Sequence, residues 1–193
     1  MRRIAVLLLL VSGFATATWA QEKDEAPKIR VCVAEIRNAA KRPVSLAMQR
    51  ERLMKELNHS KAPKKAADKR AIEALPMSGD SPATAEGAAR DRRCDYLLYT
   101  TIAELRDAAD FRNTREAAED NGLAPRSASV HEAQTFARVS FSLLRPGSLS
   151  PVMQLEISTR ENMVEEPTVM QVMDRIAQRV NTAVRESPPD MRE

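Results

Sequence analysis

Aromatic residues make up only 4% of this 193-residue sequence, and its 5 glycines stand apart from one another. Proteins that bind nucleic acid usually combine a concentrated basic surface with aromatic side chains for stacking, so we expect no nucleic-acid partner. A phosphate-binding loop needs closely spaced glycines after a strand, and no such group of glycines is present. These absences argue against nucleotide and nucleic-acid binding.

Histidine and cysteine are scarce, with two of each in the chain. Metal sites need several ligands at defined spacings, whereas these four residues are scattered singly. No Gly-x-Ser-x-Gly elbow marks a nucleophilic serine, and no Cys and His share a compatible setting. His59 and His131 both fall in predicted loops. We therefore predict no catalytic residue, no metal and no cofactor, and a protein that is not an enzyme.

Residues 1–20 have the three parts of a secretory signal peptide. Arg2 and Arg3 give the positive start, Ile4 to Val11 form the apolar run, and Thr18-Trp19-Ala20 is a cleavage site of the small-x-small kind. The run is too short to cross a bilayer, and no cysteine follows it to carry a lipid anchor. We expect a cleaved signal and a periplasmic protein with no transmembrane segment. The alternative is an uncleaved anchor or a buried helix.

Cleavage would lower the formal net charge from +3 to +1, because Arg2 and Arg3 are the only charged residues of that segment. The positive net charge of the full chain is therefore partly due to the signal peptide. About 173 residues would remain (193 minus 20), which is enough for one domain with a substantial core. We predict a charged leader at 21–28, a single domain at 29–186 and a tail at 187–193.

The most apolar internal stretch, residues 94–105, is predicted to be the central strand of a sheet. Both of its alternating faces are apolar, which is typical of a strand covered on two sides. Strands are predicted before it at 29–36 and 71–76, and helices between the strands at 43–57 and 82–92. The alternating order of strands and helices indicates right-handed crossovers and a mainly parallel sheet.

A β-hairpin and a helix are predicted in the last third of the chain. Residues 135–143 and 152–159 alternate apolar and polar on either side of a turn at 145–148. The polar face of the hairpin would be exposed to solvent. Its inward side chains, on the opposite face, would be Ala137, Val139, Phe141, Leu143, Met153, Leu155 and Ile157. The C-terminal helix has an inner stripe consisting of Val169, Val172, Met173, Ile176, Val180 and Val184. Its predicted outward residues are Asp174, Arg175, Gln178, Arg179 and Arg185. The fold class is therefore α/β, with a mostly parallel βαβαβ half extended by the hairpin and this amphipathic helix.

Between the central strand and the hairpin, residues 106–133 show no periodicity and are rich in small polar side chains. The segment is long for a connection, so we predict a flexible insertion loop. It is either a disordered excursion or a loop that orders against a partner protein. Its only large apolar residues are the candidate partner-binding residues: Phe111, Leu123 and Val130.

Cys32 and Cys94 could form a disulfide in an exported protein, and the chain-entropy model gives such a bridge about 4 kcal/mol. However, Cys32 lies inside one predicted strand and Cys94 at the start of another. If those strands are parallel and start level, the two residues are offset by about two to three positions, at or beyond bridging reach. A disulfide and two buried thiols both stay open.

Residues 61–70 are strongly basic and carry no apolar stripe. Such a stretch is most often a solvated loop or a frayed helix end. The alternative is a segment that lies against phosphate-rich envelope material.

The order of these elements resembles a group of bacterial envelope proteins, and so does the phrase from Ala89 to Ile102, Ala-Arg-Asp-Arg-Arg-Cys-Asp-Tyr-Leu-Leu-Tyr-Thr-Thr-Ile. The similar families are the curli secretion component, the penicillin-binding-protein activator and the N-terminal domain of the TolB translocation protein. In them, a helix ending in a small residue, a variable residue and Asp-Tyr leads into the central strand, and a hairpin and C-terminal helix follow. Here these parts correspond to 89–102, 135–159 and 168–185.

The sequence also departs from those families. The curli channel adds membrane-spanning hairpins and a lipid anchor, and neither is evident here. The glycine that the families often carry near the end of the central strand is replaced by Thr100 or Thr101. The resemblance therefore implies the fold and an envelope protein that binds other proteins, without the pore.

We expect an exported, non-enzymatic periplasmic protein-interaction module that assists envelope assembly, secretion or regulation. Its partners would be envelope proteins, and an oligomer is compatible with the predicted edge strands. The alternative is a small-molecule or lipid carrier that binds between the sheet and the C-terminal helix, which would require a sizeable apolar cavity.

Overall fold

The structure is a computed structural model, and it describes residues 27–66, 68–79, 82–106, 134–148, 150–161 and 164–188. The elements in chain order are β1 (Ile29–Val33), β2 (Arg37–Asn38), α1 (Leu46–His59), β3 (Ile72–Pro76), α2 (Pro82–Asp91), β4 (Tyr96–Arg106), β5 (Thr135–Leu144), β6 (Pro151–Glu161) and α4 (Glu165–Glu186).

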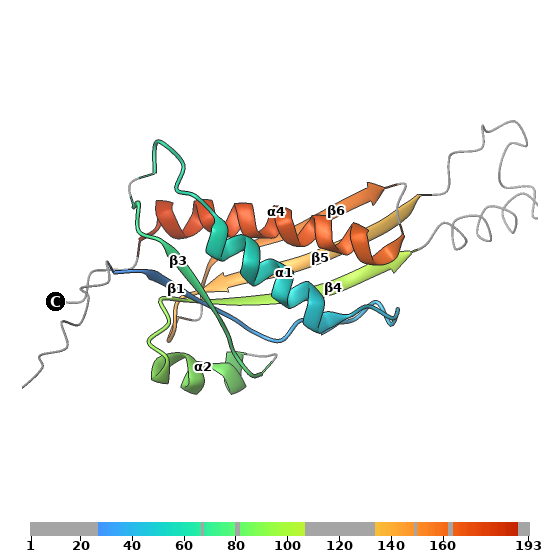
Figure 1. The fold of residues 1–193 in the computed structure, drawn as a ribbon. Coiled ribbons are helices and arrows are strands. Elements are labelled where there is room, and N and C mark those ends of the chain that lie inside the picture. The colour runs from blue at the N-terminus through green and yellow to red at the C-terminus, as the bar shows by residue number, and fades with distance from the viewer. Residues whose placement is uncertain are drawn as a thin grey trace, which may run out of the picture.

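All described strands belong to one sheet, with the order β3-β1-β4-β5-β6 and with β2 paired to β4 beside this path. The strand β1 runs parallel to β3 and β4, whereas β4, β5 and β6 are successively antiparallel. Figure 1 shows α1 and α4 on one side of the sheet and α2 on the other. The predicted α/β fold, with a parallel half, an antiparallel hairpin and a closing C-terminal helix, is confirmed.

The main core lies between the sheet and the pair of helices α1 and α4. On β5, the inward residues Ala137, Val139, Phe141 and Leu143 are at most 1% exposed, as the alternation predicts. The predicted stripe of α4 is fully buried against them. Burial of each large apolar side chain contributes about 1.5–3 kcal/mol, so this layer supplies most of the stability. Arg52 of α1 also donates to both carboxylate oxygens of Asp174, each at 2.8 Å, and ties the two helices together.

Among the described residues, the second face of the sheet is covered only by α2, at one end. A small cluster lies under this helix, formed by Cys32, Ala34, Met77, Ala89, Cys94 and Leu97. Beyond it, the β4–β5–β6 surface carries polar side chains. Arg138 bridges Glu104 at 2.8 Å and Glu156 at 3.7 Å there. The predicted polar face of the hairpin is confirmed.

Several element boundaries differ from the sequence prediction. The first strand ends at Val33, and the chain bends before Arg37 and Asn38 pair with β4. The helix α1 begins later than predicted, at Leu46, and extends through His59, which therefore does not lie in a loop. Arg106 pairs with Phe136 and belongs to β4 rather than to the insertion.

Parts of the prediction fall on residues that the structure does not describe. These are the signal peptide, residues 21–26 of the leader and residues 189–193 of the tail. The rest of the insertion, 107–133, also lies outside the described residues, and with it the candidate partner-binding residues Phe111, Leu123 and Val130. These assignments stay predictions.

Two side chains differ from their predicted exposure. Leu155 lies on the predicted face of β6, opposite the buried Phe141, but it is 42% exposed. The reason is that β6 is an edge strand, with a described neighbour on one side only. Arg185 was predicted to face solvent but is 2% exposed. The segment that precedes β3 packs over the end of α4 and covers it.

Candidate functional site

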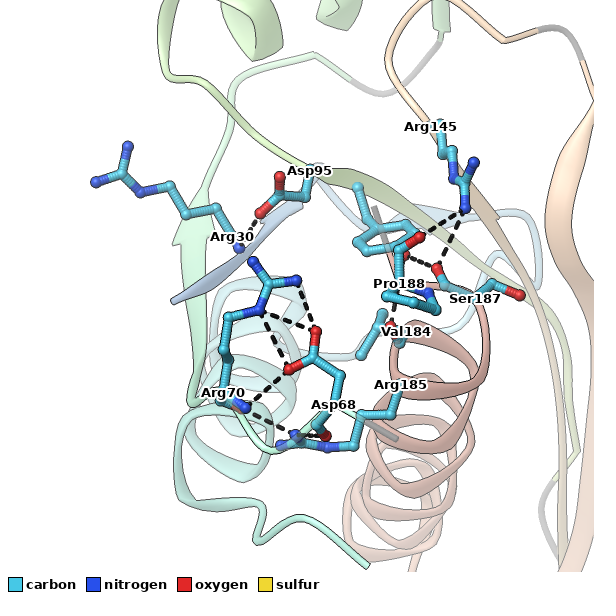
Figure 2. A network of polar contacts seen from close by, with 10 residues as sticks. Arg30, Asp68, Arg70, Asp95, Arg145, Val184, Arg185, Ser187 and Pro188 are labelled. Atoms are coloured by element: carbon cyan, nitrogen blue, oxygen red, sulfur yellow. Dashed lines mark hydrogen bonds and ion pairs between the residues drawn. The ribbon is translucent and has the colours of Figure 1, made fainter. Parts of the chain in front are cut away.

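A network of polar contacts surrounds the carboxyl end of α4 (Figure 2). The buried hydroxyl of Tyr96 donates to the carbonyl oxygen of Ser187. Arg145 donates to the carbonyl oxygens of Ser187 at 3.3 Å and Pro188 at 3.1 Å. These contacts hold the two residues that follow α4. The Tyr96 hydroxyl also lies 3.5 Å from the carbonyl oxygen of Val184 in the last turn of α4, where the carbonyls lack intrahelical donors. Burial raises the pKa of the Tyr96 phenol, which keeps it a neutral donor.

Arg185 forms the other half of the network. Its Nε donates to the Asn181 side-chain oxygen at 2.7 Å, and its Nη1 donates to the carbonyl oxygens of Asp68 at 2.9 Å and Arg70 at 2.8 Å. Burial lowers the pKa of Arg185, and the nearby Asp68 carboxylate opposes this effect. Asn181 donates to the carbonyl oxygen of Lys61 at 3.1 Å. The main chain of the 61–70 stretch is therefore held against α4, while its lysine side chains are exposed, as the solvated-loop interpretation predicts.

Asp68 and Arg70 form an ion pair within the same segment. Arg70 donates from its side chain to both carboxylate oxygens, with a shortest distance of 2.6 Å. These hydrogen bonds hold the pKa of Asp68 below its usual range. These contacts hold the ends of α4, β3 and β4 together.

The carboxyl ends of β1 and β3 are the place where open α/β sheets commonly bind ligands. Here Arg50 donates from Nη2 to the carbonyl oxygens of Val33 and Met77, both at 2.7 Å. Arg92 donates to the carbonyl oxygen of Pro76. Burial lowers the pKa of Arg50, while Glu35 opposes that shift. The protein's own arginines thus occupy the ends of these strands.

Cys32 and Cys94 are joined as a disulfide, with their Cα atoms 5.9 Å apart. The strands are offset as predicted, since Cys32 lies opposite Leu97. A tight turn overcomes this offset: Arg93 has a φ of 53°, and the Cys94 N–H donates to the carbonyl oxygen of Ala89 at 3.0 Å. This C-terminal cap of α2 brings Cys94 over β1 before the chain becomes extended. The bridge links β1 and β4 beneath α2.

The outer edge of β6 is the longest free strand edge among the described residues. The strand has 11 residues and pairs with β5 alone. Main-chain donors and acceptors on its outer side have no partner strand within the described part of the chain. Leu155 is exposed along this edge, and Ile157 lies two residues further on the same face.

A groove of about 420 Å³ lies between β6 and α4. Its lining is Ile157 on the strand and Arg175, Gln178, Arg179 and Thr182 on the helix. Gln178 and Arg179 lie three and four positions after Arg175, and Thr182 lies three positions after Arg179, so the four helix residues form one stripe, called the α4 stripe below. Arg175 lies 3.7 Å from Glu161, and Arg179 forms no ion pair with any described residue. The groove is therefore basic and open.

This groove lies where the carrier hypothesis placed an apolar cavity. Only one of its five lining residues is apolar, and the space between α4 and the sheet is filled by buried side chains. Such a lining suits charged or polar groups rather than a lipid. In the sequence, Arg175 and Arg179 were predicted only to face outward. The sequence feature that could have indicated this groove is the polar stripe at helical spacing in the C-terminal helix, which follows directly after an alternating last strand.

Within the described ranges, no three residues among His, Cys, Asp and Glu are grouped so that they could bind a metal ion. The same residues contain no helix with the length and apolarity needed to cross a membrane.

No protein-family model and no curated protein sequence matches the chain. Solved structures match its fold. The hypothetical protein CT253 from Chlamydia trachomatis is 13% identical, with 82% of this chain and 98% of that chain covered and a TM-score of 0.53. PelC from Paraburkholderia phytofirmans, solved as a dodecamer, is 13% identical, with 82% and 88% covered and a TM-score of 0.49. The lipoprotein GNA1162 from Neisseria meningitidis is 12% identical, with 80% and 98% covered and a TM-score of 0.37.

At this identity the comparison with CT253 shows a shared fold and nothing further. None of the three structures is named as a curli component, a penicillin-binding-protein activator or a TolB protein. The finer resemblance suggested by the sequence therefore gains no support from them.

Proposed function

We propose that this chain is an exported protein of the cell envelope that works by binding other proteins, without catalysing a reaction. The observation that carries the proposal is the free edge of β6, which is long, partly apolar and bordered by an open groove. An edge of this kind can pair with another chain, and proteins usually blunt such edges when they have no use for them.

Two of the three charged residues of β6 lie on the face away from α4 and do not blunt its edge on the helix side. These are Glu156, which lies 3.7 Å from Arg138, and Arg160, whose guanidinium lies 5.7 Å from the centre of the Phe136 ring. Leu155 and Ile157 occupy the face on the helix side, next to the basic groove. On this side the described ion pair of β6 joins Glu161 to Arg175, so a carboxylate of the partner would compete with Glu161 for that guanidinium.

Export is supported by the signal-peptide pattern of residues 1–20, which directs the mature chain to the periplasm. There it would assist assembly, secretion or regulation in the envelope. The insertion at 107–133 would be a second contact region, independent of the β6 edge. Because Arg106 pairs with Phe136, a short turn can replace the insertion without breaking the β4–β5 pairing. Such a deletion should leave thermal unfolding nearly unchanged and remove partners that bind through the loop.

Site-specific crosslinking in living cells tests the proposal. A photoreactive amino acid at Leu155 should capture defined envelope proteins, identified by mass spectrometry. The matched control carries the same amino acid at Glu51, an exposed position on α1. Equal capture from both positions, or none from Leu155, would contradict a binding role for this edge.

A further inference from the structure

We propose that the outer edge of β6 and the basic groove beside it bind an extended, acidic segment of another protein by strand addition. This inference rests on the proposed function, because it names the site and the partner chemistry of a binding protein. Each part of it comes from a different feature: the main chain of β6, the side chains of its inner face, and the charge of the α4 stripe.

The main chain of β6 provides the docking edge. All inter-strand contacts described for β6 are with β5, through a register that runs from Thr135 opposite Glu161 to Leu144 opposite Pro151. In an antiparallel pair, alternate main-chain groups of each strand point away from the partner strand. An added strand would therefore find a row of donors and acceptors along the outer side of β6 that no described strand binds.

The side chains of β6 define which face of an added strand enters the groove. Leu155 and Ile157 lie opposite the buried residues Phe141 and Val139, so they belong to the face that α4 covers. Every second side chain of an added strand would lie beside Leu155 and Ile157 and below the α4 stripe. The intervening side chains would lie beside polar residues of the other face, such as Ser158.

The charge of the groove selects acidic side chains. Arg175 and Arg179 both line it, and Glu161 is the acid that pairs with Arg175. Because Arg179 has no ion-pair partner among the described residues, the groove retains positive charge. A carboxylate on the groove-facing side of the added strand would meet one or both guanidinium groups, while an aliphatic side chain would cover Leu155.

The same charge argues against a second copy of this chain as the occupant. Antiparallel pairing of two β6 strands would place both α4 helices on the same face of a continuous sheet. The α4 stripe of each copy would then face the other, and Arg175 and Arg179 would meet like charges. A heterologous acidic segment avoids this repulsion.

The test uses a heptapeptide, Thr-Glu-Thr-Val-Thr-Glu-Thr-amide, with a fluorescent dye on its amino terminus, and the purified, oxidised protein without its signal peptide. The control peptide carries Gln in place of both Glu residues. Fluorescence anisotropy at low salt should give a Kd about tenfold lower for the acidic peptide, and added salt should reduce the difference. The Arg175→Gln, Arg179→Gln double variant should bind both peptides alike. The matched control is Arg160→Gln, on the opposite face of β6, and its Kd should change less than about twofold.

Two N-methylated versions of the acidic peptide separate strand addition from simple charge attraction. One is methylated on its Thr residues and the other on its Glu and Val residues, so each blocks one edge of the extended peptide. Strand addition predicts that one version loses about tenfold or more in affinity and the other binds normally. Equal binding of both versions would overturn strand addition, and equal binding of acidic and neutral peptides would overturn the acidic partner.

Sedimentation of the protein alone tests the second copy. A dimer that Leu155→Lys dissociates, and that the acidic peptide does not displace, would overturn the inference in favour of self-association. If the peptides fail to bind while the Leu155 crosslinks in cells persist, only this inference fails. If both are absent, the proposed function fails as well.

Discussion

The two edges of the sheet are built in opposite ways. The strand β3 has 5 residues, ends in Pro76 and lies under α1. Its main-chain groups are bound by side chains: the Ala74 N–H donates to the Asn58 side chain at 2.7 Å, and Arg92 donates to the carbonyl oxygen of Pro76. By contrast, β6 has 11 residues, and the described residues provide no such side-chain contacts to its outer main chain.

This contrast separates a structural half of the molecule from a half suited to binding. Proline, short length and bound edge groups are the devices by which proteins prevent unwanted strand pairing, and β3 has all three. The disulfide and the Arg185 network also lie on the side of β3, β1 and the start of β4. Substitutions there should therefore reduce stability, whereas substitutions along β6 should affect binding.

The largest effect is expected from removal of the disulfide. The Cys32→Ala, Cys94→Ala double variant should lose about 4 kcal/mol in the free energy of unfolding, because the bridge closes a loop with a sequence separation of 62. Urea unfolding measures this loss, and the reduced wild-type protein should show a similar one. An unchanged midpoint after reduction would indicate that the bridge does not stabilise this half of the sheet.

Loss of the buried Arg185 should come next. Arg185→Leu leaves the carbonyl oxygens of Asp68 and Arg70 without this donor in a nearly dry site, so we expect a loss of about 3 kcal/mol. Hydrogen exchange should rise in β3 and not in β6. The matched control is Arg179→Leu, which lies on the same helix but is exposed and should change stability by less than about 0.5 kcal/mol.

The regular parts of this fold could be predicted from the sequence because they depend on periodicity. Alternation in β5 and the helical stripe of α4 identify faces that are buried by large neighbours, and both predictions agree with the structure. The strand–helix order of the first half predicts parallel pairing for the same reason, since each crossover must return to the same sheet. Turn residues between the last two strands predict the hairpin.

The exceptions depend on long-range contacts that periodicity does not report. Arg185 is buried because a segment more than a hundred residues away in sequence crosses it, and Leu155 is exposed because β6 has one described neighbour. The disulfide depends on the positive φ of Arg93, a non-glycine residue in the left-handed region. The basic groove needs Arg175 and Arg179 to be next to a free edge, which the sequence of α4 alone does not determine.

A smaller loss of stability is expected when the one side chain that binds the Ala74 N–H of β3 is removed. Asn58→Ala removes the acceptor of the Ala74 N–H and should cost about 1–2 kcal/mol in the free energy of unfolding. Asn58→Asp retains an oxygen at this position and should recover most of that loss. If Asn58→Ala leaves the free energy of unfolding unchanged, water can replace the lost hydrogen bond to the Ala74 N–H. The edges of β3 and β6 would then differ less in protection than their side-chain contacts suggest.

The Asp68–Arg70 ion pair should make the stability of the structural half, on the side of β3 and β1, sensitive to acid. The pKa of Asp68 is lowered in the folded protein, so its contribution is complete above the ordinary value of about 3.9 and is lost as the pH falls through the lower folded value. Asp68→Asn should therefore cost on the order of 1 kcal/mol at neutral pH and progressively less below about pH 4. Urea unfolding of both proteins across this range checks the convergence. A constant difference would assign the effect to packing rather than to charge.

The smallest change in stability is expected at the open edge. Leu155 is 42% exposed, and threonine has a β-branched side chain that suits a strand, so Leu155→Thr should change the free energy of unfolding by less than about 0.5 kcal/mol. The same substitution should weaken binding of the acidic heptapeptide about threefold, because it removes the contact between the Leu155 side chain and an aliphatic side chain of the peptide. The pair of measurements distinguishes a binding surface from a packed one. A loss of stability above about 1.5 kcal/mol with no change in binding would mean that β6 is covered in the folded chain, and the two edges would then be alike.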